Sequence, residues 1–409
     1  MGAVQDGQLG ERRQLSISSI ACRGKFCDCQ PTSEWMIMSN WLPRLLGSTR
    51  DAAWREGAGA TVRAGGYATL LLLALSIAGL GEVAHAANAK AAGLQSCAKG
   101  PVASSKTPRP GHYIALNRFD GRQEMIDALQ PGVRGIQKKY SWRSLESEPG
   151  SYDFAAIEAD LDLLAKRGAR LVVFLEDKSF DGSIPVPPYL EKFILKNRQE
   201  GYTSKRWDPF VVDRTKAIIA AIGRAFDCHA GFEGLAVQES ALGIEDEILN
   251  ANGYSPLKYR DALIEVLGSA AEATPNSTVF WYMNFLRGGQ KYIGDIASAV
   301  AASGVAMGGP DVLPDRASLV RRVYPYYSRF KGKMTLFNSM QYNSYRHEHT
   351  DPSYPTKYWT MEELFVFARD KLHVNYVFWT RKVTRKPADS YDWTDALPVI
   401  EATADFAGS

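Results

Sequence analysis

Apolar runs and amphipathic stretches alternate along the chain from His112 onward. Eight short apolar runs are typical of buried parallel strands, and they predict strands at His112–Leu116, Val133–Lys138, Arg170–Leu175, Gly234–Val237, Thr278–Met283, Val305–Met307, Met334–Phe337 and Val374–Trp379. Apolar residues at three- and four-residue spacing predict helices between them, at Phe154–Arg167, Val212–Phe226, Leu257–Ala273, Ile293–Ala302, Arg316–Phe330 and Met361–Leu372. This alternation predicts the α/β class and a single (β/α)8 TIM barrel.

The N-terminal region does not share this alternation. Thr69–Leu80 is an apolar run that is short for a membrane span, with Arg63 before it and the small-residue pattern Ala84-His85-Ala86 after it. This order predicts a secretory signal peptide and a secreted or periplasmic protein, and an anchor that is never cleaved is the alternative. The predicted division is 1–87 for the pre-segment and signal, 88–109 for a linker, and 110–409 for the barrel.

Composition narrows the classes of partner. The 409 residues carry a formal net charge of +3, with 23% charged residues and no basic run interleaved with aromatics. Nucleic acid is therefore not an expected partner, nor is a membrane beyond the signal peptide. Aromatic residues make up 11% of the chain. Such residues suit the stacking surfaces of carbohydrate clefts, but large cores use them too.

The cysteines divide into two groups around the predicted signal. Cys22, Cys27 and Cys29 precede it, and Cys97 and Cys228 follow it. In an oxidising compartment the latter two can pair and tie the N-terminal tail to the barrel. Two unpaired thiols are the equal alternative, because connectivity cannot be derived from sequence.

The stretch around Glu239 is the first candidate for chemistry. Leu235–Val237 is predicted to be a buried strand, so Gln238 and Glu239 follow at its carboxyl end, where barrel active sites are built. A carboxyl group at the rim of an apolar barrel is suited to be a general acid, because desolvation raises its pKa. We therefore expect a raised pKa for Glu239. A surface glutamate at a strand–loop junction is the alternative.

Two segments and one tryptophan carry a resemblance to a known family. The segment 140–154 (YSWRSLESEPGSYDF) resembles the W-x-x-L-E-P-x-x-G-x-Y-D-F stretch of the large (β/α)8-barrel clan of retaining glycoside hydrolases, which includes β-galactosidases and cellulase-like enzymes. Val186–Leu190 is similar to the P-x-W-L stretch of that clan. Trp379 resembles its eighth-strand tryptophan, which forms the floor of the sugar site. The resemblance covers about Tyr113 to Lys382 and implies a glycoside hydrolase that acts on an oligo- or polysaccharide. Together with the predicted signal peptide, it leads us to expect an exported enzyme.

The resemblance also implies catalytic positions, with one departure. The clan has its acid/base glutamate after strand four, usually in an Asn-Glu pair, and Gln238-Glu239 stands there in this chain. Its nucleophile is a glutamate after strand seven, where residues 334–342 contain no carboxylate and Ser339 or Gln341 takes the place. Since neither side chain can readily be the nucleophile, a non-catalytic carbohydrate-binding barrel is the alternative function.

Other carboxylates could supply the second catalytic group. Asp311 is the preferred candidate, because a Gly-Gly-Pro lead predicts a tight loop at the rim after strand six. Glu176 and Asp177 at the third strand, Glu245–Glu247 and Glu348 are further candidates, with Glu176 also a partner for Lys138 or Lys139. The predicted substrate-binding residues are Gln238, Trp281, Tyr282, Asn284, Gln341, Tyr342, Trp379 and Glu176.

A histidine-rich segment is the remaining motif. His347, His349 and Asp351 have plausible metal-ligand side chains, which would suit a metal-dependent hydrolase. The spacing matches no strong metal motif, so we prefer a polar loop at the mouth of the barrel. The predicted barrel also lacks a nucleotide-binding glycine motif. We therefore expect neither a metal nor a cofactor.

Overall fold

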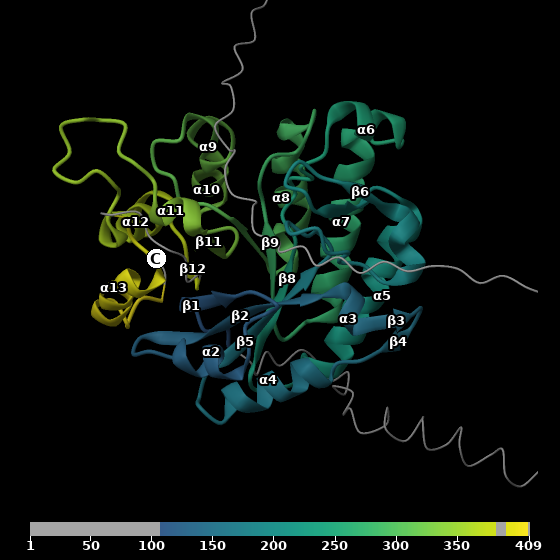
Figure 1. The fold of residues 1–409 in the computed structure, drawn as a ribbon, viewed down its shortest axis with the longest axis horizontal. Coiled ribbons are helices and arrows are strands. Elements are labelled where there is room, and N and C mark those ends of the chain that lie inside the picture. The colour runs from purple at the N-terminus through teal and green to yellow at the C-terminus, as the bar shows by residue number, and fades with distance from the viewer. Residues whose placement is uncertain (1–106, 382–389, 408–409) are drawn as a thin grey trace, which may run out of the picture. The chain divides into compact units, whose positions relative to one another are not determined.

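The strands of the described chain close into a barrel (Figure 1). The computed structural model describes residues 107–381 and 390–407. Neighbouring barrel strands are all parallel, in the order β1-β12-β11-β10-β9-β8-β5-β2. They are β1 (Gly111–Leu116), β2 (Val133–Ser141), β5 (Arg170–Glu176), β8 (Phe232–Val237), β9 (Thr278–Tyr282), β10 (Val305–Gly309), β11 (Leu336–Met340) and β12 (Tyr376–Thr380). Each of the eight predicted strands overlaps one of these, and the predicted (β/α)8 barrel is confirmed.

Helices surround the strands on the outside of the barrel (Figure 1). The longer ones are α4 (Ala155–Ala165), α5 (Pro209–Phe226), α7 (Pro256–Ala273) and α8 (Ile293–Val300). The others are α2 (Arg122–Asp127), α3 (Trp142–Leu145), α6 (Asp246–Ala251), α9 (Ala317–Arg322), α10 (Tyr324–Phe330), α11 (Tyr342–Tyr345), α12 (Met361–Val366) and α13 (Leu397–Ala402). None of the described helices is long and apolar enough to cross a membrane.

Several local features differ from the prediction. The predicted helix Arg316–Phe330 is two helices, α9 and α10, that meet at Val323. Pro325 stands in the first turn of α10, and a proline cannot continue a preceding helix because it lacks the N–H and clashes with the turn before it. The hairpins β3–β4 (Glu146–Glu148, Ser151–Tyr152) and β6–β7 (Ile194–Lys196, Tyr202–Ser204) were not predicted. Their strands are too short to show a period.

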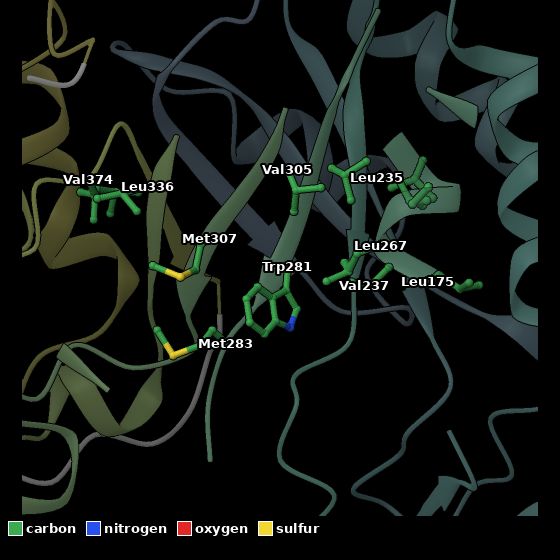
Figure 2. Packing of buried hydrophobic residues seen from close by; sticks show 14 of the residues in the cluster. Leu175, Leu235, Val237, Leu267, Trp281, Met283, Val305, Met307, Leu336 and Val374 are labelled. Atoms are coloured by element: carbon green, nitrogen blue, oxygen red, sulfur yellow. The ribbon is translucent and has the colours of Figure 1, made fainter. Parts of the chain in front are cut away.

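The strands bury both of their faces. One cluster of buried side chains includes Phe174, Phe280, Tyr282 and Phe378, which point into the barrel. A second cluster fills the layer between the strands and the helices, and Figure 2 shows part of it around Trp281. Since side chains alternate along a strand, a residue's position along its strand decides which of the two layers it enters.

This alternation overturns the predicted role of two tryptophans. On β9, Phe280 and Tyr282 belong to the interior cluster, so Trp281 points outward into the helix layer. On β12, Trp379 likewise points outward, and its indole N–H donates to Nδ1 of His112 at 3.1 Å. Both indoles are 0% exposed. The prediction that Trp281 and Trp379 contact a sugar is therefore wrong, because neither reaches the mouth of the barrel.

Most of the predicted N-terminal division lies outside the described residues. This holds for the signal peptide, for nearly all of the linker and for Cys97. Cys228 is disulfide-bonded. The pairing of Cys97 with Cys228 stays a prediction.

Candidate active site

A cavity of about 510 Å³ opens at the carboxyl ends of the barrel strands. Both predicted catalytic carboxylates contribute to its wall. The predicted site residues that line it are Gln238, Glu239, Tyr282, Asp311, Gln341 and Tyr342. The other predicted site residues, Asn284, Glu176, Trp281 and Trp379, are not part of its lining.

Glu239 follows β8 and has both carboxylate oxygens engaged. Lys178 donates from Nζ to Oε1 at 2.8 Å, and Asn284 donates from Nδ2 to Oε2 at 2.7 Å. Although burial pushes the pKa of Glu239 upward, the Lys178 ammonium and these two hydrogen bonds outweigh it, and the pKa lies below its ordinary value. The prediction of a raised pKa is therefore wrong, because sequence reasoning counted desolvation and missed the cation.

Lys178 is a candidate functional residue that the sequence analysis did not identify. It lies in the loop after β5, is 1% exposed, and also donates to the carbonyl of Ala241 at 2.9 Å. The side-chain amide of Gln238 donates to the carbonyl of Lys178 at 2.9 Å, which joins that loop to the end of β8. Burial lowers the pKa of Lys178 despite the charge of Glu239. Its one sequence signal is its place two residues beyond the end of a buried strand.

Arg206 also connects the loop after β5 to the end of β8. Its guanidinium binds both oxygens of Asp177 at 2.7 Å and donates to the backbone carbonyl of Glu239 at 2.5 Å. Asp177, a candidate second carboxylate, is thus engaged in an ion pair and does not line the cavity. On the other side, Ser240 accepts from the backbone N–H of Asn284 at 2.8 Å and so positions the amide that binds Glu239. Glu239 is held by contacts from two neighbouring loops.

Asp311 is the second carboxyl group of the cavity. It follows β10, where a Cβ on Gly308 would come within 2.2 Å of the carbonyl oxygen of Phe337. Only glycine permits this approach of β10 to β11. The Asp311 side chain makes no hydrogen bond to the described part of the chain. Burial, with the negative charge of Glu239 adding to it, raises the pKa of Asp311 to about 7.

Glu176 lies beside the cavity rather than in its wall. It is 2% exposed at the end of β5, accepts from Arg118 at 2.6 Å, and lies 3.8 Å from Lys139. Burial raises the pKa of Glu176 against the effect of these two cations. The expectation that Glu176 pairs with Lys139 is confirmed, although its direct hydrogen bond comes from Arg118.

Neutral polar groups complete the floor of the cavity. The hydroxyl of Tyr282 donates to Oε1 of Gln137 at 2.8 Å and lies 2.9 Å from the hydroxyl of Ser339. Ser339 is on β11, the seventh barrel strand, and Gln341 follows as the N-terminal cap of α11. The position where the resemblance implies a nucleophilic glutamate is therefore occupied by a hydroxyl and an amide.

The remaining candidate residues do not line the cavity. Glu245 and Asp246 form exposed ion pairs with Arg198 and Arg287, and Glu348 pairs with Lys357. His347 pairs with Asp315, whereas the ring of His349 stacks on Tyr354 and Trp359. Among the described residues, no group of three or more His, Cys, Asp or Glu side chains could hold a metal ion.

Comparisons with known proteins give likenesses of fold only. No protein-family model and no curated protein matches the chain. Among solved structures it is similar to an exo-β-1,4-mannosidase from Opitutaceae bacterium strain TAV5, with 13% identity, a TM-score of 0.44, and coverage of 75% of this chain and 62% of that one. It is also similar to a β-galactosidase from the psychrophilic Marinomonas ef1, with 8% identity, a TM-score of 0.45, and coverage of 72% and 59%.

A β-galactosidase from Bacillus circulans sp. alkalophilus gives the same result, with 10% identity, a TM-score of 0.46, and coverage of 73% of this chain and 56% of that one. The chain thus spans roughly three fifths of the length of these proteins. These solved structures are glycoside hydrolases. The barrel fold of this chain rests on its own strand order and pairing.

Proposed function

We propose that the protein is a glycoside hydrolase in which Asp311 is the general acid and Glu239 is the ionised partner. The observation that carries the proposal is a pair of carboxyl groups in one cavity whose pKa values are shifted in opposite directions. Glycosidic hydrolysis needs one carboxylic acid to protonate the leaving oxygen and one carboxylate to attack or to activate water. The arrangement supplies both near neutral pH.

The proposal reverses the role expected for Glu239. Its paired Lys178 keeps it ionised, so it has no proton to give. Asp311 has its carboxyl free of hydrogen bonds to the described chain and a pKa of about 7, so it holds a transferable proton at the pH where Glu239 has none. The substrate is proposed to be a polysaccharide or oligosaccharide, and the protein is proposed to be exported. The apolar run with its small-residue cleavage pattern supports export.

The leaving-group dependence of two variants tests the roles. Asp311→Asn should lower kcat/KM on unactivated glycosides by a factor on the order of 10²–10⁴, the usual worth of general acid–base catalysis. A nitrophenyl glycoside should lose less, because its leaving group needs little protonation. Glu239→Gln should slow both substrates to a similar extent. If Glu239→Gln is instead rescued by the good leaving group, the roles are the reverse.

The stereochemistry of the product shows whether Glu239 is the nucleophile or the general base. Retention of configuration, followed by NMR on the first product, assigns Glu239 as nucleophile, and inversion assigns it as the base for water. The control is Glu191→Gln, which removes an exposed carboxylate that pairs with Arg143 outside the cavity. This variant should hydrolyse both substrates as the parent does.

A non-catalytic carbohydrate-binding barrel is the second candidate. It is favoured by one observation, that both oxygens of Glu239 are already occupied by Lys178 and Asn284 while the seventh strand offers no carboxylate. In that case no glycoside is hydrolysed, and oligosaccharides bind equally well to the parent and to Asp311→Asn. Calorimetric titration on the two proteins separates this outcome from catalysis.

A further inference from the structure

Strand β2 presents two hydrogen-bond donors to the cavity that the proposed hydrolysis does not use. Gln137 and Lys139 both line the cavity and are two residues apart, so they lie on the same face of the strand. In the ring of eight strands, β2 is four strands away from β10, which precedes Asp311. The two donors therefore stand across the mouth of the barrel from the proposed acid.

The side-chain amide of Gln137 is only half satisfied. The residue is 3% exposed, and its Oε1 accepts from Tyr282. This bond fixes the orientation of the amide, and its buried Nε2 has no partner among the described residues. A buried N–H group without an acceptor is costly. Gln137 lines the cavity, so an oxygen of a bound ligand is a candidate acceptor for this group.

The ammonium group of Lys139 is only weakly engaged by neighbouring side chains. Its ammonium lies 3.8 Å from Glu176, which is too far for a hydrogen bond, and Glu176 is already bound by Arg118 at 2.6 Å. The side chain is 25% exposed. The ammonium also lies 5.9 Å from the centre of the ring of Phe180, which lines the cavity and is 43% exposed. A cation, an amide donor and an exposed aromatic ring thus occur together.

The two cavity carboxyl groups do not counteract this cation fully. Lys178 neutralises Glu239 through a 2.8 Å ion pair, and Asp311 holds a proton below about pH 7. Lys139 is the one cationic residue in the described lining of the cavity. An anion in this part of the mouth would meet a positive charge that is weakly engaged and two negative charges that are largely neutralised.

We propose that the cavity takes a sugar unit with an anionic substituent, which binds to Lys139 and Gln137 while the sugar ring lies against Phe180. This inference rests on the proposed function and names the substrate class of the same site. A uronic acid carboxylate and a sulfate ester share the required chemistry, since both offer anionic oxygens to an ammonium and an amide. The substrates are accordingly acidic glycans rather than neutral ones.

Calorimetry on the full chain tests the preference. Asp311→Asn is used as background to suppress turnover, and the probes are three tetrasaccharides of matched length: a 1,4-linked uronate, a neutral 1,4-linked glucan and its sulfated form. At low salt we expect one anionic probe to bind about tenfold or more tighter than the neutral one, with a preference that shrinks as salt is added. The tighter of the two anionic probes identifies the substituent.

Variants of the donors connect the preference to this place. In the same background, Lys139→Gln should reduce the preference about tenfold and leave the affinity for the neutral probe nearly unchanged. Gln137→Glu keeps the acceptor for Tyr282 but replaces the free donor with a carboxylate, so it should weaken the anionic probes further. Lys166→Gln, which removes an exposed lysine at the end of α4, is the matched control and should change nothing.

The possible failures are distinguishable. Equal affinity for neutral and anionic probes, or a preference that survives Lys139→Gln, overturns this inference and leaves the hydrolysis of neutral glycosides to be judged by its own variants. A preference that requires Lys139 in a protein that hydrolyses none of the glycans overturns the proposed hydrolysis and leaves the anionic subsite in place. Thermal unfolding of each variant shows that the comparison is made between folded proteins.

Discussion

Strand β8 has an ion-paired glutamate near each end, and the two have different surroundings. Near its start, Glu233 accepts from Arg170 at 2.6 Å, from the hydroxyl of Tyr376 at 2.6 Å and from the backbone N–H of Arg109 at 2.7 Å. Just beyond its end, Glu239 accepts from Lys178 and Asn284 and also lines a cavity with Asp311. Both glutamates are ion-paired, but the side chain of Glu233 is 0% exposed and that of Glu239 is 17% exposed.

This difference shows that an ion pair inside the barrel does not by itself indicate a catalytic site. Glu233 is enclosed by three donors from separate parts of the chain, and it closes the amino-terminal end of the barrel. Glu239 has the same kind of partner, but a second carboxyl group with a raised pKa shares its cavity. Access and a second carboxyl group separate the catalytic candidate from the structural residue.

In the comparison of the two glutamates, the largest effect on stability should come from the closed end. Glu233→Gln leaves the Arg170 guanidinium buried without its counter-charge, so we expect the free energy of unfolding to fall by about 3–5 kcal/mol. Chemical denaturation measures the loss. Hydrolysis per folded molecule should stay within a few-fold of the parent, because Glu233 lies at the opposite end of the barrel from the cavity.

The double variant Glu233→Gln/Arg170→Met sharpens this test. Removing both charges should recover much of the lost stability, because no uncompensated charge remains. A single variant as stable as the parent would show that Arg170 finds another partner, and the closed end would then not depend on the pair.

An intermediate effect should appear as a pH dependence at the open end. The pKa of Asp311 is about 7 in the folded protein and 3.8 as its ordinary value. Between these two pH values the folded state holds a proton that the unfolded chain has released, so the free energy of unfolding falls as pH rises through this window. This contribution is fully present below about pH 4 and lost above about pH 7, and it amounts to roughly 2–4 kcal/mol.

Asp311→Asn isolates this contribution. Unfolding of the parent and the variant, measured from pH 4 to pH 8, should give a difference that changes over this window and is flat outside it. Titrating groups that do not interact with Asp311 are common to both proteins and cancel, and the pKa of the coupled Glu239 is lowered from its ordinary value of 4.5, toward the acidic end of this range. A difference that does not change with pH would mean that Asp311 titrates normally, and the assignment of the general acid would fail with it.

The smallest effect should come from the aromatic ring at the cavity. Phe180→Ala removes an exposed ring, so the free energy of unfolding should change by less than about 0.5 kcal/mol. If the ring stacks on sugar, KM should rise by a factor of about 2 to 10, which corresponds to the usual worth of an aromatic contact. Steady-state kinetics measures this.

Trp281→Ala is the matched contrast for the aromatic prediction. It removes a ring that is 0% exposed in the helix layer, and it should cost about 3–5 kcal/mol of stability with little effect on KM. An unchanged KM in Phe180→Ala would remove the stacking surface from the site.

The barrel could be predicted because its signal is local. Each strand is a short apolar run bounded by turn-forming residues, and each glutamate or aspartate after such a run is placed at the rim by the parallel arrangement alone. Glu239 and Asp311 were found in this way, on strands that lie two places apart in the barrel order. The absence of a carboxylate after the seventh strand could be predicted from the sequence for the same reason.

The electrostatics of the site could not be predicted, because they depend on contacts between distant residues. Lys178 and Glu239 are 61 positions apart and meet because β5 and β8 are neighbours in the barrel. Burial of Glu239 was expected from its strand, but its ion pair was not, and the direction of the pKa shift follows from that pair. The tryptophans failed for a geometric reason, since a displacement by one residue along a strand moves a side chain to the other face.

The contacts that cross between the loops after β5 and β8 have a consequence for protein engineering. Arg206 binds Asp177 and the carbonyl of Glu239, and Gln238 binds the carbonyl of Lys178. A graft that replaces either loop alone would separate buried charges and carbonyl groups from their partners. We expect the two loops to behave as a single cassette, which can be transplanted to another barrel only when both are moved together with the start of α5.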